Sequence, residues 1–167
     1  MIELGFNMKF EIVSFKSVGP IEFGMSERQL YAAFGKADDV QRNTRPEVEC
    51  YYPNVIVRLN KEMGVVNEVT FFSDPSIELY LGDVSLDWSG AFVPDLCDLD
   101  GDPREALGYI CLHNLGLMLV DFFDGDIEPA ITVASTEMMN KIINDPDPVL
   151  DMKVLKKKMK KVGVKPR

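Results

Sequence analysis

Short amphipathic segments alternate with glycine-containing turns along the 167-residue chain. Over residues 9–15 polar and apolar residues alternate, which places Phe10, Ile12 and Phe15 near a buried surface and predicts a strand. The same reasoning predicts strands at residues 48–52, 55–60, 65–72, 77–81 and 84–86. Two hairpins are expected, one around Met63-Gly64 and one across Asp124-Gly125, where residues 117–123 meet residues 127–134.

Capping residues predict short helices between these strands. Ser26 and Gln29 form a capping box that begins one helix, and Gly35 ends it. Ser135 or Thr136 caps a later helix. The residues that share one face of that helix are Met138, Met139, Ile142 and Ile143. Both helices are short, so we expect packing to hold them in place.

A further helix is predicted after an aspartate-rich segment. Residues 95–102 (DLCDLDGD) are expected to form a loop. Asp102 then caps the helix, Pro103 occupies its first position and Glu105 completes a capping box.

Helices followed by runs of antiparallel strands predict an α+β fold. We expect one domain over residues 1–152, with a curved, mainly antiparallel sheet, two or three short helices and a mobile basic tail over residues 153–167. An internal duplication is plausible, because VIVRLNKEMGVVNEVTFF and GLMLVDFFDGDIEPAITV align on Gly64 and Gly125 with one extra residue afterwards. The pseudo-repeats would span about residues 9–86 and 87–144.

Charge is distributed unevenly along the chain, whose net charge is −9. Residues 153–167 hold eight Lys and Arg and no acid, so residues 1–152 carry 10 bases against 27 acids, or −17. Such a body repels nucleic acid and attracts basic proteins. For the tail, whose Leu155, Met159 and Val162 share a helical face, three alternatives stay open: a membrane-surface or nucleic-acid helix, docking on the acidic body, or a frayed end.

Several classes of protein are disfavoured by what the chain contains. We find no export signal and no apolar run long enough to span a membrane, so we expect a cytoplasmic protein without a membrane partner. In that compartment the three cysteines, Cys50, Cys97 and Cys111, are expected to be reduced and buried.

Motifs for catalysis or metal binding are weak. The glycines of residues 18–35 lack the spacing of a phosphate loop, and residues 98–102 place their glycine too early for an EF-hand. Cys111 and His113 are too far apart along a strand for a good hydrogen bond, and zinc would need further ligands from distant strands. We expect no catalytic residue, metal or cofactor. A small hydrolase using Cys111 with His113, or a carboxylate pair, is the alternative.

Two segments resemble motifs of known proteins. Residues 18–35 (VGPIEFGMSERQLYAAFG) and 109–120 (YICLHNLGLMLV) resemble a G-P-I-x-F-G-M-S helix opening and a Leu-Gly-Leu strand entry found in a diffuse group of small bacterial proteins. The helix opening is also similar to the tandem helix–strand repeats of β-lactamase-inhibitor-like and outer-membrane-assembly lipoprotein folds. This resemblance implies a binding scaffold, and members of such groups can serve as immunity proteins beside secreted toxins.

The sequence therefore predicts a binding protein and not an enzyme, specifically an immunity or antitoxin-type inhibitor of a basic toxin domain such as a nuclease. Its acidic surface would pair with the cations that the nuclease uses for phosphate. A non-catalytic scaffold or oligomerisation module is a further alternative. The predicted partner-binding residues are Asp95, Asp98, Asp100, Asp124, Asp126, Glu128 and Trp88.

Overall fold

The computed structural model describes residues 8–42, 46–106, 109–123, 125, 128–143 and 150–165. Within these residues the chain forms four helices and two sheets, neither of which is closed. The fold is α+β, as predicted. Its strands form two sheets, however, where the sequence predicts one.

The larger sheet has eight strands in the order β10-β11-β12-β13-β7-β6-β5-β4, and every neighbouring pair is antiparallel. Its strands are β4 (Asp39–Gln41), β5 (Glu47–Tyr52), β6 (Val55–Asn60), β7 (Val65–Phe72), β10 (Arg104–Ala106), β11 (Tyr109–Leu112), β12 (Leu117–Val120) and β13 (Ala130–Ala134). Each run of four consecutive strands forms a meander. The two meanders join where β7 pairs with β13 and Thr70 lies opposite Thr132.

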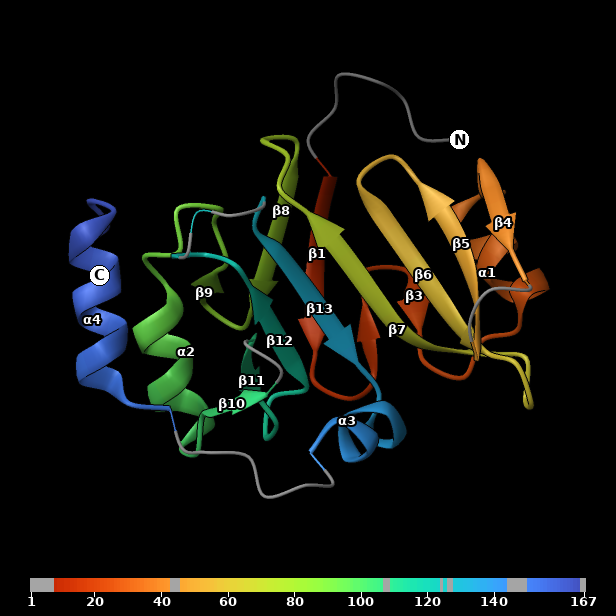
Figure 1. The fold of residues 1–167 in the computed structure, drawn as a ribbon. Helices are drawn as coiled ribbons and strands as arrows, with labels where there is room; N and C mark the ends of the chain where they lie inside the picture. Colours follow the sequence, from red (N-terminus) through yellow and green to blue (C-terminus); the bar gives the residue numbers. More distant parts are fainter. Residues whose placement is uncertain are drawn as a thin grey trace.

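The smaller sheet, in the order β3-β2-β1-β8-β9, lies behind the larger one (Figure 1). Its strands are β1 (Met8–Val13), β2 (Ser17–Val18), β3 (Ile21–Glu22), β8 (Ile77–Leu81) and β9 (Val84–Ser85). Strands β1 and β8 are parallel, and this pairing of distant segments has no local sequence signal. The core lies between the sheets, where the ring centroids of Phe10 and Phe71 are 5.0 Å apart.

Helix α1 (Glu27–Phe34) begins at the predicted capping box. The backbone N–H of Gln29 donates to Ser26 Oγ at 3.2 Å, and the backbone N–H of Ser26 donates to Gln29 Oε1 at 2.9 Å. Gly24 and Gly35 have φ values of 95° and 98°, a region that favours glycine. These glycines therefore direct the chain into and out of the helix, whose buried Leu30 joins the core.

Helix α2 (Val93–Asp100) replaces the predicted loop over residues 95–102, so that prediction is wrong. Its apolar residues Val93, Leu96 and Cys97 recur at helical spacing and are buried in the core. Burial of this face outweighs the preference of aspartate for loops, because several apolar side chains leave water together.

The predicted helix capped by Asp102 is also wrong. Gly101 ends α2 in the left-handed conformation, with φ at 80°, and its N–H donates to the carbonyl of Cys97 at 3.1 Å. The chain then enters β10, which pairs with β11 through Arg104 and Cys111. Pro103 thus precedes an edge strand and does not start a helix.

Helix α3 (Thr136–Ile142) begins as predicted, with Ser135 as its N-cap accepting from the N–H of Met138 at 3.2 Å. Its predicted face is confirmed: Met139 is buried, and the side chains of Met138, Ile142 and Ile143 pack around the same small cluster.

Part of the basic tail forms a packed helix where the sequence predicts a mobile segment, which corrects the prediction. Residues Met152–Lys161 form helix α4, which lies beside α2 (Figure 1). Leu155 and Met159 are only 3% and 0% exposed, whereas Val162 is 48% exposed. Of the three alternatives, the structure shows docking on the protein's own body, because the apolar face of the helix is used for packing.

A helix followed by a four-stranded meander occurs twice, as α1 with β4 to β7 and as α2 with β10 to β13. Thr70 follows Gly64 by six residues and Thr132 follows Gly125 by seven, so the predicted alignment makes these threonines equivalent. The common origin of the halves stays a prediction, which this arrangement supports. Both the first and the last strands of residues 9–86 belong to the smaller sheet, outside the meander.

Candidate functional site

One face of the larger sheet carries little covering structure within the described residues. In Figure 1 the front of β5, β6 and β7 is bare, and α3 lies only near the lower end of β13. Side chains alternate between the two faces along each strand. Val69 and Val133 point into the core, so Arg58, Thr70 and Thr132 point to the front. We call this front surface the open face.

A network of polar side chains crosses the open face from β5 to β13. Arg58 Nε donates to Glu49 Oε2 at 3.0 Å, and Arg58 Nη1 lies 3.4 Å from Glu68 Oε1. The same Nη1 donates to Thr70 Oγ1 at 2.9 Å, and Thr70 Oγ1 is 2.8 Å from Thr132 Oγ1. Glu49 and Glu68 are only 4% and 8% exposed. The network therefore holds its side chains in fixed positions across four strands.

Half-buried and charged side chains surround this network toward β4. Tyr51 and Ile56 face each other across β5 and β6, and the Tyr51 hydroxyl donates to Glu49 Oε1 at 3.2 Å. Glu47 is half-buried, and Asp39, opposite Tyr51, is exposed. A tyrosine, an aliphatic residue and carboxylates on a preordered sheet are suited to contact a basic protein surface.

The sequence-predicted acids do not form one surface. Asp95 and Asp98 are exposed on α2, which packs on the inner face, away from the open face. Glu128 is exposed just before β13. Asp124 and Asp126 lie outside the described residues.

Asp100 has an internal role that the sequence did not reveal. It is 4% exposed, and its Oδ1 accepts from the backbone N–H groups of Asn114 and Leu115 at 2.9 and 3.1 Å. Its carbonyl accepts from Asn114 Nδ2 at 2.9 Å. Asp100 thus holds the turn between β11 and β12 against the end of α2, and its carboxylate is not presented at the surface.

Trp88 also takes part in internal packing. Its indole N–H donates to the carbonyl of Asp74 at 2.9 Å, and its ring stacks on Phe122 at an interplanar angle of 7°. Phe122 in turn contacts Phe92 edge-on and Phe123 at a tilt. The side chain is half-buried, so its predicted contact with a partner stays a prediction.

The Cys111 and His113 side chains are directed to different neighbours. His113 Nε2 lies 3.0 Å from Asp102 Oδ2, which also accepts from Arg104 Nη2 at 2.8 Å. The hydrogen bond from Arg104, and to a smaller extent that with His113, holds the pKa of Asp102 below its usual value. Cys111 is fully buried, and its Sγ is 3.5 Å from Met139 Sδ. The enclosed thiol is thus closed to a substrate in this structure.

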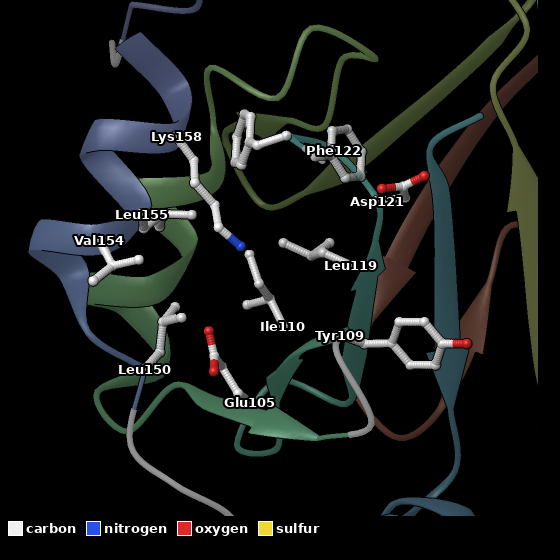
Figure 2. A pocket seen from close by; sticks show the side chains of 11 residues that line it. Glu105, Tyr109, Ile110, Leu119, Asp121, Phe122, Leu150, Val154, Leu155 and Lys158 are labelled. Carbon is white, nitrogen blue, oxygen red and sulfur yellow. The ribbon is translucent and has the colours of Figure 1, made fainter. Parts of the chain in front are cut away.

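A cavity of about 30 Å³ lies beneath α4 (Figure 2). Leu155 and Lys158 of α4 reach toward Ile110 and Leu119 of the sheet. This volume holds about one or two water molecules. The cavity is therefore a packing gap under the docked helix and is too small for a substrate.

Among the residues that the structure describes, no three His, Cys, Asp or Glu side chains come together as a metal site requires. None of their helices is both long and apolar enough to cross a membrane. The expected absence of a metal stays a prediction.

The carboxylates of the open face were missed in the sequence, although a signal for them was present. Glu47, Glu49 and Tyr51 alternate with Val48 and Cys50, which marks two faces of a strand. Their importance depends on which face of the sheet stays uncovered, and the alternation alone does not decide that.

Comparison with protein-family models, curated proteins and solved structures finds no match for this chain.

Proposed function

We propose that this protein is a cytoplasmic inhibitor of the immunity or antitoxin kind, which binds and neutralises a basic toxin domain, with a nuclease domain as the expected target. The observation that carries the proposal is the open face, a sheet surface with a preordered polar network and half-buried side chains. Protein interfaces combine such half-buried aromatic and aliphatic side chains with a polar rim.

Charge supports a basic partner. Residues 1–152 carry 10 bases against 27 acids, and α4 confines the lysines of the tail to one end of the molecule (Figure 1). A protein surface that binds nucleic-acid phosphate is rich in Lys and Arg. An acidic body would attract that surface, speed association and cover the cations that hold the substrate.

The test is isothermal titration calorimetry with the basic nuclease domain encoded beside the gene of this protein. The open-face variant combines Asp39→Asn with Glu47→Gln, because both side chains are accessible and lie outside the central network. We expect its affinity to fall about tenfold, mostly at low salt, because rim charges act through long-range attraction.

Two matched variants locate the contact. Glu11→Gln with Asp83→Asn removes the same charge from exposed positions of the smaller sheet and its hairpin, and should change the affinity less than about twofold. Asp95→Asn with Asp98→Asn tests the surface predicted from sequence. If only the α2 variant weakens binding, the open face is not the contact. Absence of binding, or binding that does not respond to salt, would overturn the inhibitor proposal itself.

A further inference from the structure

A recess of about 400 Å³ lies where α3 approaches the β6–β7 hairpin, at one end of the open face. Its lining is mixed, because Pro46 and the carbon atoms of the other side chains contribute apolar surface beside the polar groups. The side chains that matter for its chemistry are those of Glu47, Asn60, Lys61, Glu62, Asn67 and Lys141. The volume lies in the range of pockets that hold small ligands.

Two of these side chains, those of Asn60 and Lys141, already interact with neighbouring groups of the protein. Asn60 Oδ1 accepts from the N–H groups of Glu62 and Met63 at 2.8 and 3.3 Å, and its Nδ2 donates to Glu137 Oε1 at 3.1 Å. Lys141 Nζ lies 3.2 Å from the same Glu137 oxygen. The Asn60 amide is therefore fixed within the protein, whereas Lys141 has only an ion-pair partner at the surface.

Asn67 is different, because its side-chain oxygen has no partner. Asn67 is 4% exposed. Among the described residues, its Oδ1 is the single buried side-chain oxygen or nitrogen atom that has no hydrogen-bond partner. The reason is local: β6 pairs Arg58 with Glu68 and Leu59 with Val66, so Asn67 is the extra residue of a β-bulge. Bulges often redirect a side chain at a functional site. A buried acceptor without a donor is costly, so its retention calls for a reason.

We propose that this recess binds a guanidinium or ammonium group. Asn67 Oδ1 lacks a donor, so the occupant must supply one. Because this oxygen is fully buried, the Asn67 side chain must turn toward the recess to accept that hydrogen bond. Glu47 and Glu62 supply carboxylates in the same recess, which Lys61 and Lys141 also line. Because Lys141 is paired with Glu137, the two carboxylates against Lys61 leave one net negative charge, which favours a cationic donor. An anion would bring a further acceptor and would leave Asn67 unsatisfied.

The natural occupant is an arginine of the basic partner, and this identification rests on the proposed function. The recess adjoins the open face, because Glu47 of β5 and Asn60 of β6 line it, so a partner lying on β5 to β7 can place one side chain into it. A planar guanidinium, with five donors, can reach a carboxylate and an amide oxygen together. A free small guanidinium offers the same chemistry.

The test is an NMR titration of the ¹⁵N-labelled full chain with agmatine, which carries a free guanidinium. We expect saturable millimolar shifts at the Asn67 side-chain amide and at the backbone of Glu62. Sodium acetate at equal ionic strength should cause no saturable shift. Absence of saturation with agmatine, or equal shifts with acetate, overturns the proposal.

Variants assign the binding to these residues. Glu47→Gln, at a half-buried position, and Asn67→Ala should each weaken agmatine binding about tenfold, read from backbone resonances. Glu22→Gln, an exposed residue of β3, should leave it unchanged. Unchanged binding in Glu47→Gln, a variant expected to fold, contradicts the assignment even if Asn67→Ala does not fold.

The source of the guanidinium is decided separately. A short peptide from the toxin domain containing its exposed arginines should compete with agmatine, and its Arg→Ala form should not. Agmatine binding without peptide competition would show a site for a free guanidinium and would contradict the partner arginine. Binding of the unmodified protein to the nuclease domain, measured by calorimetry, tests the inhibitor proposal independently of either result, because only the open-face variant shares Glu47 with the recess.

Discussion

The hydroxyl oxygens of Thr70 and Thr132 lie 2.8 Å apart at the point where the two meanders meet. Thr70 also accepts from Arg58, so this contact links the seam between the halves to the ionic network of the open face. Both threonines are buried, at 5% and 6% exposure. The structure thus places one hydrogen-bonded network across both proposed repeats.

Thr70→Val should destabilise the protein by about 1–3 kcal/mol, because it removes the acceptor of Arg58 and the partner of Thr132. Thr132→Val should cost less, since Thr70 keeps its bond from Arg58. In urea unfolding the double variant should lose less than the sum of the single changes, by about 0.5 kcal/mol or more. Strictly additive losses would show that the two hydroxyls are not coupled.

Asp100 should matter for stability and not for binding. Asp100→Ala leaves the buried N–H groups of Asn114 and Leu115 without their acceptor, and we expect a loss of about 2 kcal/mol in urea unfolding. Asp98→Ala, at an exposed position of the same helix, should change stability by less than about 0.5 kcal/mol. Equal effects of the two substitutions would contradict the internal role of Asp100.

Docking of α4 predicts a clear difference between its buried middle and its exposed end. Leu155→Ala should destabilise the protein by about 2–4 kcal/mol, because its side chain is buried in the core cluster. Val162→Ala removes an exposed side chain from the end of the helix and should cost less than about 0.5 kcal/mol. Chemical unfolding and limited trypsin digestion would measure both. A neutral Leu155→Ala variant would indicate that the helix does not pack on the body.

The cysteines predict a loss of stability at alkaline pH. Burial raises the pKa of the Cys50 thiol to about 11 and that of Cys97 to about 12, against an ordinary value of 9.0. Because these folded-state pKa values are raised, the stabilising contribution is complete below pH 9.0 and is lost as the pH rises toward 11 and 12.

Under reducing conditions, the urea midpoint should therefore decrease as the pH rises from about 9 to about 10, before most tyrosines ionise. Cys50→Ala with Cys97→Ala should lower the midpoint but flatten its pH dependence. A thiol reagent should modify Cys50, Cys97 and Cys111 slowly in the folded protein and rapidly in urea, because all three are buried. Fast modification of the folded protein would contradict this enclosure.

Local signals predicted much of the secondary structure. The Ser26–Gln29 capping box and the hairpin around Gly64 depend on residues close in sequence, and the structure confirms both. Residues 95–102 show where such signals fail. Their aspartates favour a loop locally, but Leu96 and Cys97 gain more by burial in the core as parts of a helix.

By itself, the sequence determined the α+β class, most strand positions and the separation of an acidic body from a basic tail, since these follow from local periodicity and charge. Tertiary structure alone decided the parallel pairing of β1 with β8, the docking of α4 and the uncovered face of the larger sheet. The physical reason is that alternation shows that a strand has two faces, whereas packing between distant segments determines which face is covered. The open face and the unpaired oxygen of Asn67 exist only through that packing.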